Sequence, residues 1–321
     1  MSGRQKIAWI DDNPQRERTA NQLGADFINV HKADLALALE NLLNGRPRPL
    51  VIIDHVLDKT SSTNPVFLRG STLAEAIKEK WPSCPVLGVT NTDIGDIDLR
   101  VKESYDDVIA YSDFGQHFDR IKPLAADFAH VAAARPKNTK QLVALLKPPA
   151  EDANRIESAL PEDMQRSVRD RSVSSLLYRW VNHLMLRIGF LYDDIWTATF
   201  CGLNEQGLQK VERTFRPAVY DGVFARDNDL RWWSSELPLL LYKQIKPLSG
   251  EMSWHVGRKL SGIQAKHYSK CHVCGRDYPE VVAFLDASTE ERRPMHLECT
   301  VLHPKYKREL YFEDVRMMRG S

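Results

Sequence analysis

Three aspartates and a threonine end short apolar runs, at positions where a parallel sheet would bring them together. Asp11 and Asp12 end the first run, Asp54 ends the second and Thr90 ends a third. Clustered carboxylates repel one another unless a cation lies among them, and Mg²⁺ prefers a few carboxylates together with water and phosphate oxygens. The pattern is typical of a pocket in which a carboxylate accepts a phosphoryl group and a nearby hydroxyl binds one of its oxygens.

A second candidate site lies near the C-terminus, where three of the five cysteines gather. Cys271 and Cys274 form a C-x2-C pair, and His296 and Cys299 form an H-x2-C pair. Two such pairs can converge on one ion in a tetrahedral Cys3His shell, which favours structural Zn²⁺. An odd cysteine count without a secretion signal argues against a disulfide framework. His272 is an alternative ligand, and unliganded cysteines are the plain alternative to a metal site.

The elements expected around the first site alternate between strand and helix over the first 130 residues. Apolar runs predict strands at 6–12, 26–30, 50–54, 84–90 and 106–111, and helical spacing predicts helices at 14–23, 33–43, 71–81 and 118–134. This alternation is typical of an α/β fold, a doubly wound five-stranded parallel sheet covered on both faces. The carboxyl edge of such a sheet is where α/β proteins bind their ligands.

These first 130 residues resemble the receiver domain of bacterial response regulators. The resemblance rests on Asp11 and Asp12 after the first strand, Asp54 after the third, Gly70 before the third helix, and Thr90. It implies that Asp54 is the phospho-acceptor, that Asp11, Asp12 and Asp54 bind Mg²⁺, and that Thr90 is the switch hydroxyl.

The sequence departs from the receiver pattern in two places. The family has a lysine near the end of the fifth strand, whereas Tyr111 stands at this switch position and Ser112 follows it. A phenol carries no charge at neutral pH, so it cannot neutralise a phosphoryl group. The loop between Asp54 and Gly70 is also long. Both departures are typical of a degenerate receiver that binds partners without being phosphorylated, and the remaining alternative is a plain α/β domain with incidental acidic loop ends.

The segment around the cysteines resembles a treble-clef zinc finger over roughly residues 268–303. A knuckle at the first pair, a strand at 281–286 and a helix carrying the second pair make up this pattern. Four protein ligands close a zinc shell, which favours a structural role. Treble-clef folds also occur in HNH-type nucleases, which need a further histidine as general base. The stretch around His296 has no doubled histidine, and His303 is a stray candidate.

Composition shifts divide the chain into four expected parts. A receiver-like domain covers 1–130, a linker richer in proline and charge covers 131–150, a mainly α region covers 151–265, and a small zinc-bound α+β domain covers 266–321. The middle region resembles no family. Its acidic clusters could serve nuclease-type metal chemistry, but helix caps and solvated loops explain them better; they comprise Asp193, Asp194, Asp227 and Asp229.

Charge and hydropathy limit the functions that fit this chain of 321 residues. Its net charge of +1 is too small to imply nucleic-acid binding by itself, although basic residues are frequent over 258–276. No apolar run is long enough to cross a membrane and no signal peptide is visible, so cytoplasmic placement is expected.

Together these features predict a signalling or regulatory protein rather than an enzyme. The receiver-like part would control a helical, zinc-stabilised output that binds protein or nucleic acid. A histidine kinase or a subunit of a complex is the expected protein partner, and the oligomeric state stays open. The alternatives are a receiver-regulated nuclease or other hydrolase, and a non-catalytic adaptor in a bacterial stress or antiphage system.

Overall fold

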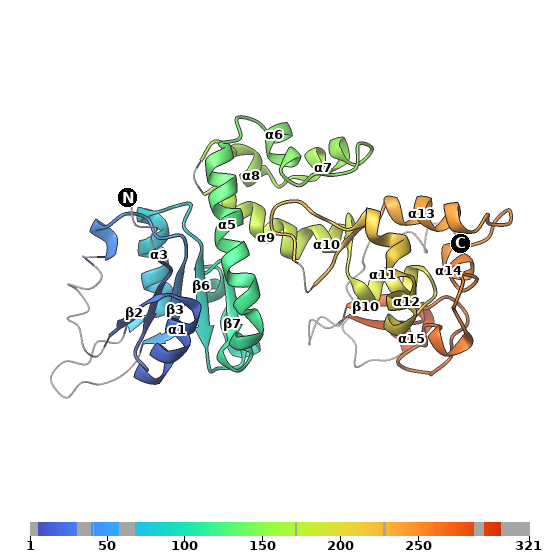
Figure 1. Cartoon of the computed structure of the whole chain (residues 1–321), viewed down its shortest axis with the longest axis horizontal. Helices are drawn as coiled ribbons and strands as arrows, with labels where there is room; N and C mark the ends of the chain where they lie inside the picture. The colour runs from blue at the N-terminus through green and yellow to red at the C-terminus, as the bar shows by residue number, and fades with distance from the viewer. Residues whose placement is uncertain are drawn as a thin grey trace. The chain divides into compact units, whose positions relative to one another are not determined.

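Figure 1 shows a computed structural model of the chain, which describes residues 6–30, 40, 42–57, 68–170, 172–226, 229–285 and 292–302. The chain divides into two compact units. Unit 1 comprises Met1–Thr139 and Pro161–Arg179, and unit 2 comprises Lys140–Leu160 and Trp180–Ser321. Most of the helix expected at 33–43, most of the long loop after Asp54, and the residues Asp227 and His303 lie outside the described residues.

Unit 1 is built on a five-stranded parallel sheet with the spatial order β2-β1-β3-β6-β7. When only the strands of this sheet are counted along the chain, their order across the sheet is 2-1-3-4-5. This is a doubly wound arrangement, and the expected α/β fold is confirmed. A two-stranded antiparallel pair, β4 and β5, follows the third strand. The strands are β1 Ala8–Asp11, β2 Asp26–Asn29, β3 Val51–Asp54, β4 Val56–Leu57, β5 Leu68–Arg69, β6 Val86–Thr90 and β7 Asp107–Ala110.

Helices cover both faces of this sheet, as the near-continuous apolar strands require (Figure 1). Alternate strand residues point to opposite faces. Trp9 and Ile52 pack with α1 and α5, whereas Ile10 and Ile53 pack with α3. The helices of unit 1 are α1 Glu17–Leu23, α3 Gly70–Lys80, α4 Leu99–Lys102, α5 Phe118–Ala134, α8 Glu162–Arg166 and α9 Val173–Arg179, with 3-10 turns at Pro14–Arg16, Ile94–Asp96 and Tyr111–His117.

A segment beyond residue 160 returns to unit 1 and packs on it through α9. The ring of Tyr178 lies 5.6 Å from that of Phe128 in α5. The Tyr178 hydroxyl donates a hydrogen bond of 2.8 Å to Asp107, and Arg179 donates one of 2.8 Å to the carbonyl of Tyr105. These contacts anchor α9 to the end of the sheet that carries β7.

Unit 2 is mainly helical, with two small antiparallel sheets. Its core is aromatic: Trp196 and Trp232 are buried, and Tyr192 stacks on Trp196 with ring centroids 4.2 Å apart. Its elements, with α6 at the junction, are α6 Thr139–Ala144, α7 Ala153–Ala159, a π-helical turn Trp180–Leu184, α10 Met185–Ile188, β8 Leu191–Tyr192, α11 Asp194–Phe200, α12 Glu205–Phe215, β9 Trp232–Trp233, α13 Glu236–Gln244, α14 Ser253–Gly257, β10 Val282–Leu285, β11 Arg292–Met295, α15 Leu297–Leu302, and 3-10 turns at Arg216–Ala218 and Ala265–His267.

The C-terminal part of unit 2 follows the expected order of knuckle, hairpin and helix. β10 and β11 pair antiparallel, with Val282 opposite Met295. Phe284, Met295 and Cys271 form a small buried cluster beneath the hairpin. No helix among the described residues is both long and apolar enough to span a membrane.

Candidate functional site

The three predicted aspartates meet at the carboxyl edge of the unit 1 sheet. Asp11 ends β1, Asp12 follows it, and Asp54 ends the neighbouring strand β3. Because these strands are parallel, their carboxyl ends lie at the same edge. All three side chains are buried, and one carboxylate oxygen from each lies within 4.8 Å of the others. Hard oxygen donors at this spacing are the donor set that Mg²⁺ prefers.

A guanidinium occupies the space between two of these carboxylates. Nη1 of Arg16 lies 2.8 Å from Oδ2 of Asp11 and 3.2 Å from Oδ2 of Asp54, and its side chain is 2% exposed. Arg16 ends the 3-10 turn that Pro14 begins, so it reaches back toward the strand ends. The pocket therefore already holds a cationic group at the point where the carboxylates converge, and Arg16 is a residue of the pocket that sequence reasoning missed.

Tyr111 supports this guanidinium through its aromatic ring. Cζ of Arg16 lies 4.3 Å from the centroid of the ring, a distance typical of cation–π contact. The Tyr111 hydroxyl lies 3.2 Å from Oγ1 of Thr19 in α1, which fixes the ring. Tyr111 thus supports the positive charge that Arg16 brings to the pocket.

Burial and like charge dominate the electrostatics of this pocket. Burial, with the neighbouring Asp11, raises the pKa of Asp54 to about 6, although the Arg16 guanidinium opposes the rise. Burial would lower the pKa of Arg16, but Asp54 and Asp11 raise it overall, so Arg16 stays charged. Asp11 also accepts hydrogen bonds from the Trp9 indole at 3.0 Å and the Asn13 amide at 2.8 Å, which hold its carboxylate in place.

Thr90 and Gly70 lie where the sequence pattern places them. Thr90 is buried at the end of β6, and its hydroxyl accepts a hydrogen bond of 2.9 Å from the amide of Thr92. Gly70 begins α3 against the end of β3: a Cβ there would lie 2.1 Å from the carbonyl oxygen of Asp54 and 2.7 Å from the Tyr105 hydroxyl. The close approach of α3 to the acidic edge therefore needs glycine at this position.

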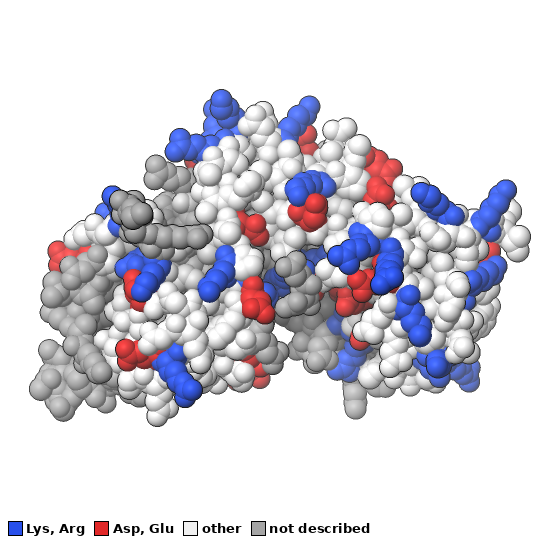
Figure 2. Space-filling model, viewed as in Figure 1, with Lys and Arg blue, Asp and Glu red and all other residues white. Residues whose placement is uncertain are grey.

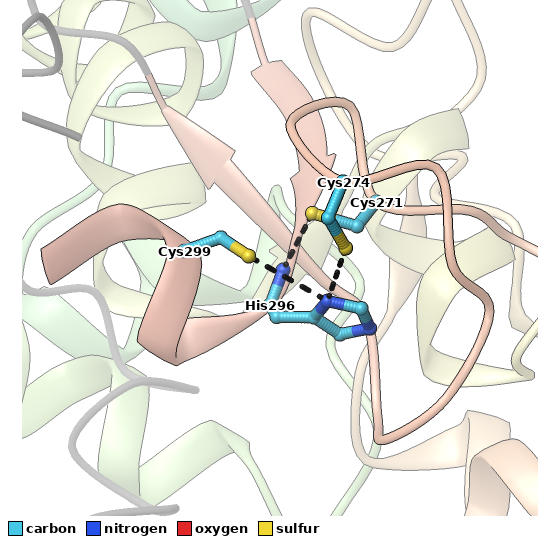
Figure 3. A group of neighbouring side chains, drawn as sticks. All are labelled: Cys271, Cys274, His296 and Cys299. Carbon is cyan, nitrogen blue, oxygen red and sulfur yellow. Dashed lines mark hydrogen bonds between the residues drawn. The ribbon is translucent and has the colours of Figure 1, made fainter. Parts of the chain in front are cut away.

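The second predicted site is also assembled, in unit 2 (Figure 3). Nδ1 of His296 lies 3.3 Å from Sγ of Cys274 and 3.8 Å from Sγ of Cys299, and the ligand atoms of these residues and Cys271 fall within 4.8 Å of one another. Ligand atoms around a tetrahedral zinc ion lie roughly 3.5–3.8 Å apart, given bonds of about 2.1–2.3 Å. The soft sulfur and imidazole donors, and their spacing, fit Zn²⁺.

Backbone amides donate hydrogen bonds that favour the thiolate form of Cys271. Burial would raise the pKa of the Cys271 thiol, but amides of Cys274, His296 and Val273 lower it overall. In contrast, burial and the neighbouring thiols raise the pKa of Cys299 to about 12. Several thiolates at this spacing need a shared cation, because without one only some of them can ionise.

Other candidate residues of unit 2 have structural partners. His272, the alternative ligand, lies outside the Cys3His group, with Nε2 3.1 Å from a guanidinium nitrogen of Arg293. Asp193 caps α11 by accepting a hydrogen bond of 2.8 Å from the Trp196 amide, and Asp229 forms an ion pair of 2.8 Å with Arg226. These two members of the acidic clusters thus serve as a cap and an ion-pair partner.

Basic residues near the cysteines are partly engaged within the unit. Arg258 lies over the rings of Trp254 and Tyr268, at 4.8 and 4.5 Å, and donates a hydrogen bond of 2.6 Å to the carbonyl of Asp277. Lys259 forms an ion pair with Glu251. Figure 2 nevertheless shows Lys and Arg side chains gathered over the end of unit 2 that carries α13 and α14.

Among known proteins, this chain is similar to several solved structures. No protein-family model matches the chain, and no curated protein matches it by sequence. A response regulator from Thermotoga maritima, in complex with Mg²⁺-BeF, is 21% identical with a TM-score of 0.29; the match covers 37% of this chain and 96% of that one. A signal receiver domain of an HD-domain-containing protein from Pseudomonas fluorescens is 21% identical with a TM-score of 0.25, covering 34% of this chain and 83% of that one.

A third similar structure is a response regulator from Burkholderia pseudomallei with a phosphorylated aspartic acid, a calcium ion and citrate. It is 18% identical with a TM-score of 0.25, and the match covers 56% of this chain and 92% of that one. The doubly wound fold itself is established by the strand order of unit 1.

Proposed function

We propose that this chain is a signalling or regulatory protein in which unit 1 is a receiver-like module and unit 2 is a zinc-stabilised output. One observation carries the proposal: carboxylates from two neighbouring strand ends, Asp11, Asp12 and Asp54, converge within 4.8 Å at the carboxyl edge of a 2-1-3-4-5 sheet. The Arg16 guanidinium offsets only one of the three buried negative charges. Because uncompensated buried charge is costly, an acidic cluster at a ligand-binding edge favours a functional pocket over incidental loop ends.

In this proposal Asp54 is the phospho-acceptor. An oxygen of its carboxylate attacks the phosphorus of a small phosphodonor, the bond from phosphorus to the donor breaks, and the leaving group departs with the electron pair. A bound Mg²⁺ would neutralise phosphoryl charge, with Asp11 and Asp12 beside Asp54 as its ligands. Thr90 stands at the next strand end and could donate its hydroxyl to a phosphoryl oxygen. In the metal-free pocket, Arg16 supplies the positive charge that Tyr111 lacks.

The second half of the proposal assigns Zn²⁺ to Cys271, Cys274, His296 and Cys299. A closed shell of four protein ligands supplies folding free energy rather than catalysis. Asp193 and Asp229 are engaged as a helix cap and an ion-pair partner, which favours a binding output over a hydrolase that would use these two carboxylates. A protein partner, such as a histidine kinase or a subunit of a complex, suits a receiver-like module, and the basic end of unit 2 leaves a nucleic-acid target open to test.

The test of the receiver assignment is covalent modification. The protein is incubated with Mg²⁺ and acetyl phosphate, and its intact mass is measured over time. One added phosphoryl group is expected on the wild type and on the Asp96→Asn control, which removes an exposed carboxylate of unit 1, and none on Asp54→Asn. Equal modification of Asp54→Asn and the wild type would contradict the assignment of Asp54.

A further inference from the structure

The acidic pocket contains its own cation, the guanidinium of Arg16. The contacts of this guanidinium indicate its role in the pocket. Arg16 uses a single nitrogen, Nη1, for both Asp11 and Asp54, at 2.8 and 3.2 Å. That nitrogen stands between two carboxylates that a divalent ion in this pocket would have to share. Arg16 and a metal ion ligated by the same oxygens cannot occupy this position together, because like charges at contact distance repel.

The Arg16 side chain is held in place by its neighbours, but not all of its hydrogen-bond donors have acceptors. The Tyr111 ring supports the guanidinium on one face, and the Tyr111 hydroxyl is tied to Thr19. Nε of Arg16, however, is buried and has no hydrogen-bond partner among the described residues. A buried donor left without an acceptor costs free energy, which lowers the stability of the inserted state and favours its displacement by a cation of higher charge.

We propose that Arg16 is a built-in competitor of the divalent cation: its guanidinium fills the metal position between Asp11 and Asp54, and the Tyr111 ring holds it there. The inference rests on the proposed function of the acidic pocket and specifies how that pocket is regulated. Metal binding requires Arg16 to leave, so the pocket responds to Mg²⁺ only above the concentration that overcomes the internal ion pairs.

Mg²⁺ affinity of the full-length protein, measured by isothermal titration calorimetry and by the Mg²⁺-dependent rise in melting temperature, tests this competition. Arg16→Met keeps much of the length of the side chain and removes its charge; it should bind Mg²⁺ about tenfold tighter or more, since one competing charge is gone. Arg18→Met is the matched control: it lies two residues away, is exposed, and should bind as the wild type does.

A second pair of variants serves if Arg16→Met does not fold without metal. Tyr111→Leu removes the ring beneath the guanidinium and should tighten Mg²⁺ binding by roughly threefold, within the range of a lost cation–π contact. Tyr111→Phe keeps the ring but loses the contact of its hydroxyl with Thr19, so its Mg²⁺ affinity should lie between those of Tyr111→Leu and the wild type.

The outcomes separate the two proposals. If the wild type binds Mg²⁺ through Asp54 but neither Arg16→Met nor Tyr111→Leu binds it tighter, the competition is overturned and the metal pocket stands. If neither the wild type nor these variants bind Mg²⁺, the metal pocket itself is overturned, and the competition with it.

Discussion

At the scale of single residues, the behaviour of the acidic pocket depends on how Asp54 ionises. Burial and the nearby Asp11 raise its pKa to about 6, whereas an aspartate in the unfolded chain titrates near 4. A raised carboxyl pKa means that the native state binds more protons than the unfolded state between these two values. The contribution of Asp54 to stability is therefore largest at low pH and falls as the pH rises from about 4 to about 6.

We predict that Asp54→Asn removes this pH dependence. Relative to the wild type in Mg²⁺-free buffer, the variant should gain about 1–3 kcal/mol in the free energy of unfolding as the pH rises from about 4 to about 6, with no further gain above that range. Urea unfolding at several pH values measures the difference. A constant difference between variant and wild type across this range would show that Asp54 titrates as an ordinary exposed aspartate.

At the scale of elements, the start of α3 is constrained by its contact with β3. Gly70→Ala would place a methyl group 2.1 Å from the Asp54 carbonyl oxygen, so the helix must shift. We predict a loss of about 2–3 kcal/mol in the stability of unit 1 and weaker Mg²⁺ binding. Gly115→Ala, where nothing lies within 4 Å, is the control and should be near neutral. Equal melting curves for both variants would contradict the contact.

The knuckle, hairpin and helix of unit 2 converge on the Cys3His group, and zinc should hold them together. We predict close to one zinc per chain by elemental analysis of protein purified without chelators. Cys274→Ser should lose the zinc and lower the melting temperature of unit 2, because metal binding there is folding free energy. Cys84→Ser, a buried cysteine of unit 1, should keep the zinc. Zinc retained at full stoichiometry by Cys274→Ser would exclude the site.

His296 provides a second test of the same group of elements. As a ligand in a closed shell it should affect stability and zinc content alone. A folded, zinc-containing His296→Ala variant that had lost a measured activity would point to chemistry at this group and contradict the structural role.

At the scale of the whole molecule, two compact units that each carry a proposed metal site predict two local responses. Mg²⁺ should slow amide hydrogen exchange around residues 8–13 and 51–55, and zinc removal should speed exchange over 271–299, since a ligand stabilises the native unit that binds it. Hydrogen-exchange mass spectrometry resolves both segments in one experiment. Mg²⁺ protection confined to 271–299 would place the ion at the wrong unit.

The sheet of unit 1 and the aspartates at its edge follow from local sequence alone. Strands buried on both faces are encoded as short apolar runs such as residues 50–53, so the amino-acid pattern is enough to predict where each strand ends and which carboxylates stand there. The cysteine group is equally local, because C-x2-C and H-x2-C pairs each bring two ligands together over a few residues.

The entry of Arg16 into the acidic pocket, in contrast, is a consequence of tertiary packing. Nothing in the local pattern separates Arg16 from Arg18; the two differ because only Arg16 meets Asp11, Asp54 and the ring of Tyr111 through space. An arginine close to the acidic pair was the signal that could have suggested this arrangement, although the local pattern offers both Arg16 and Arg18.

The return of 161–179 to unit 1 was likewise decided by packing, through the ring of Tyr178 on that of Phe128. The composition of this segment predicted a place in the helical middle region, because contacts between segments distant in sequence leave no periodic trace in either segment.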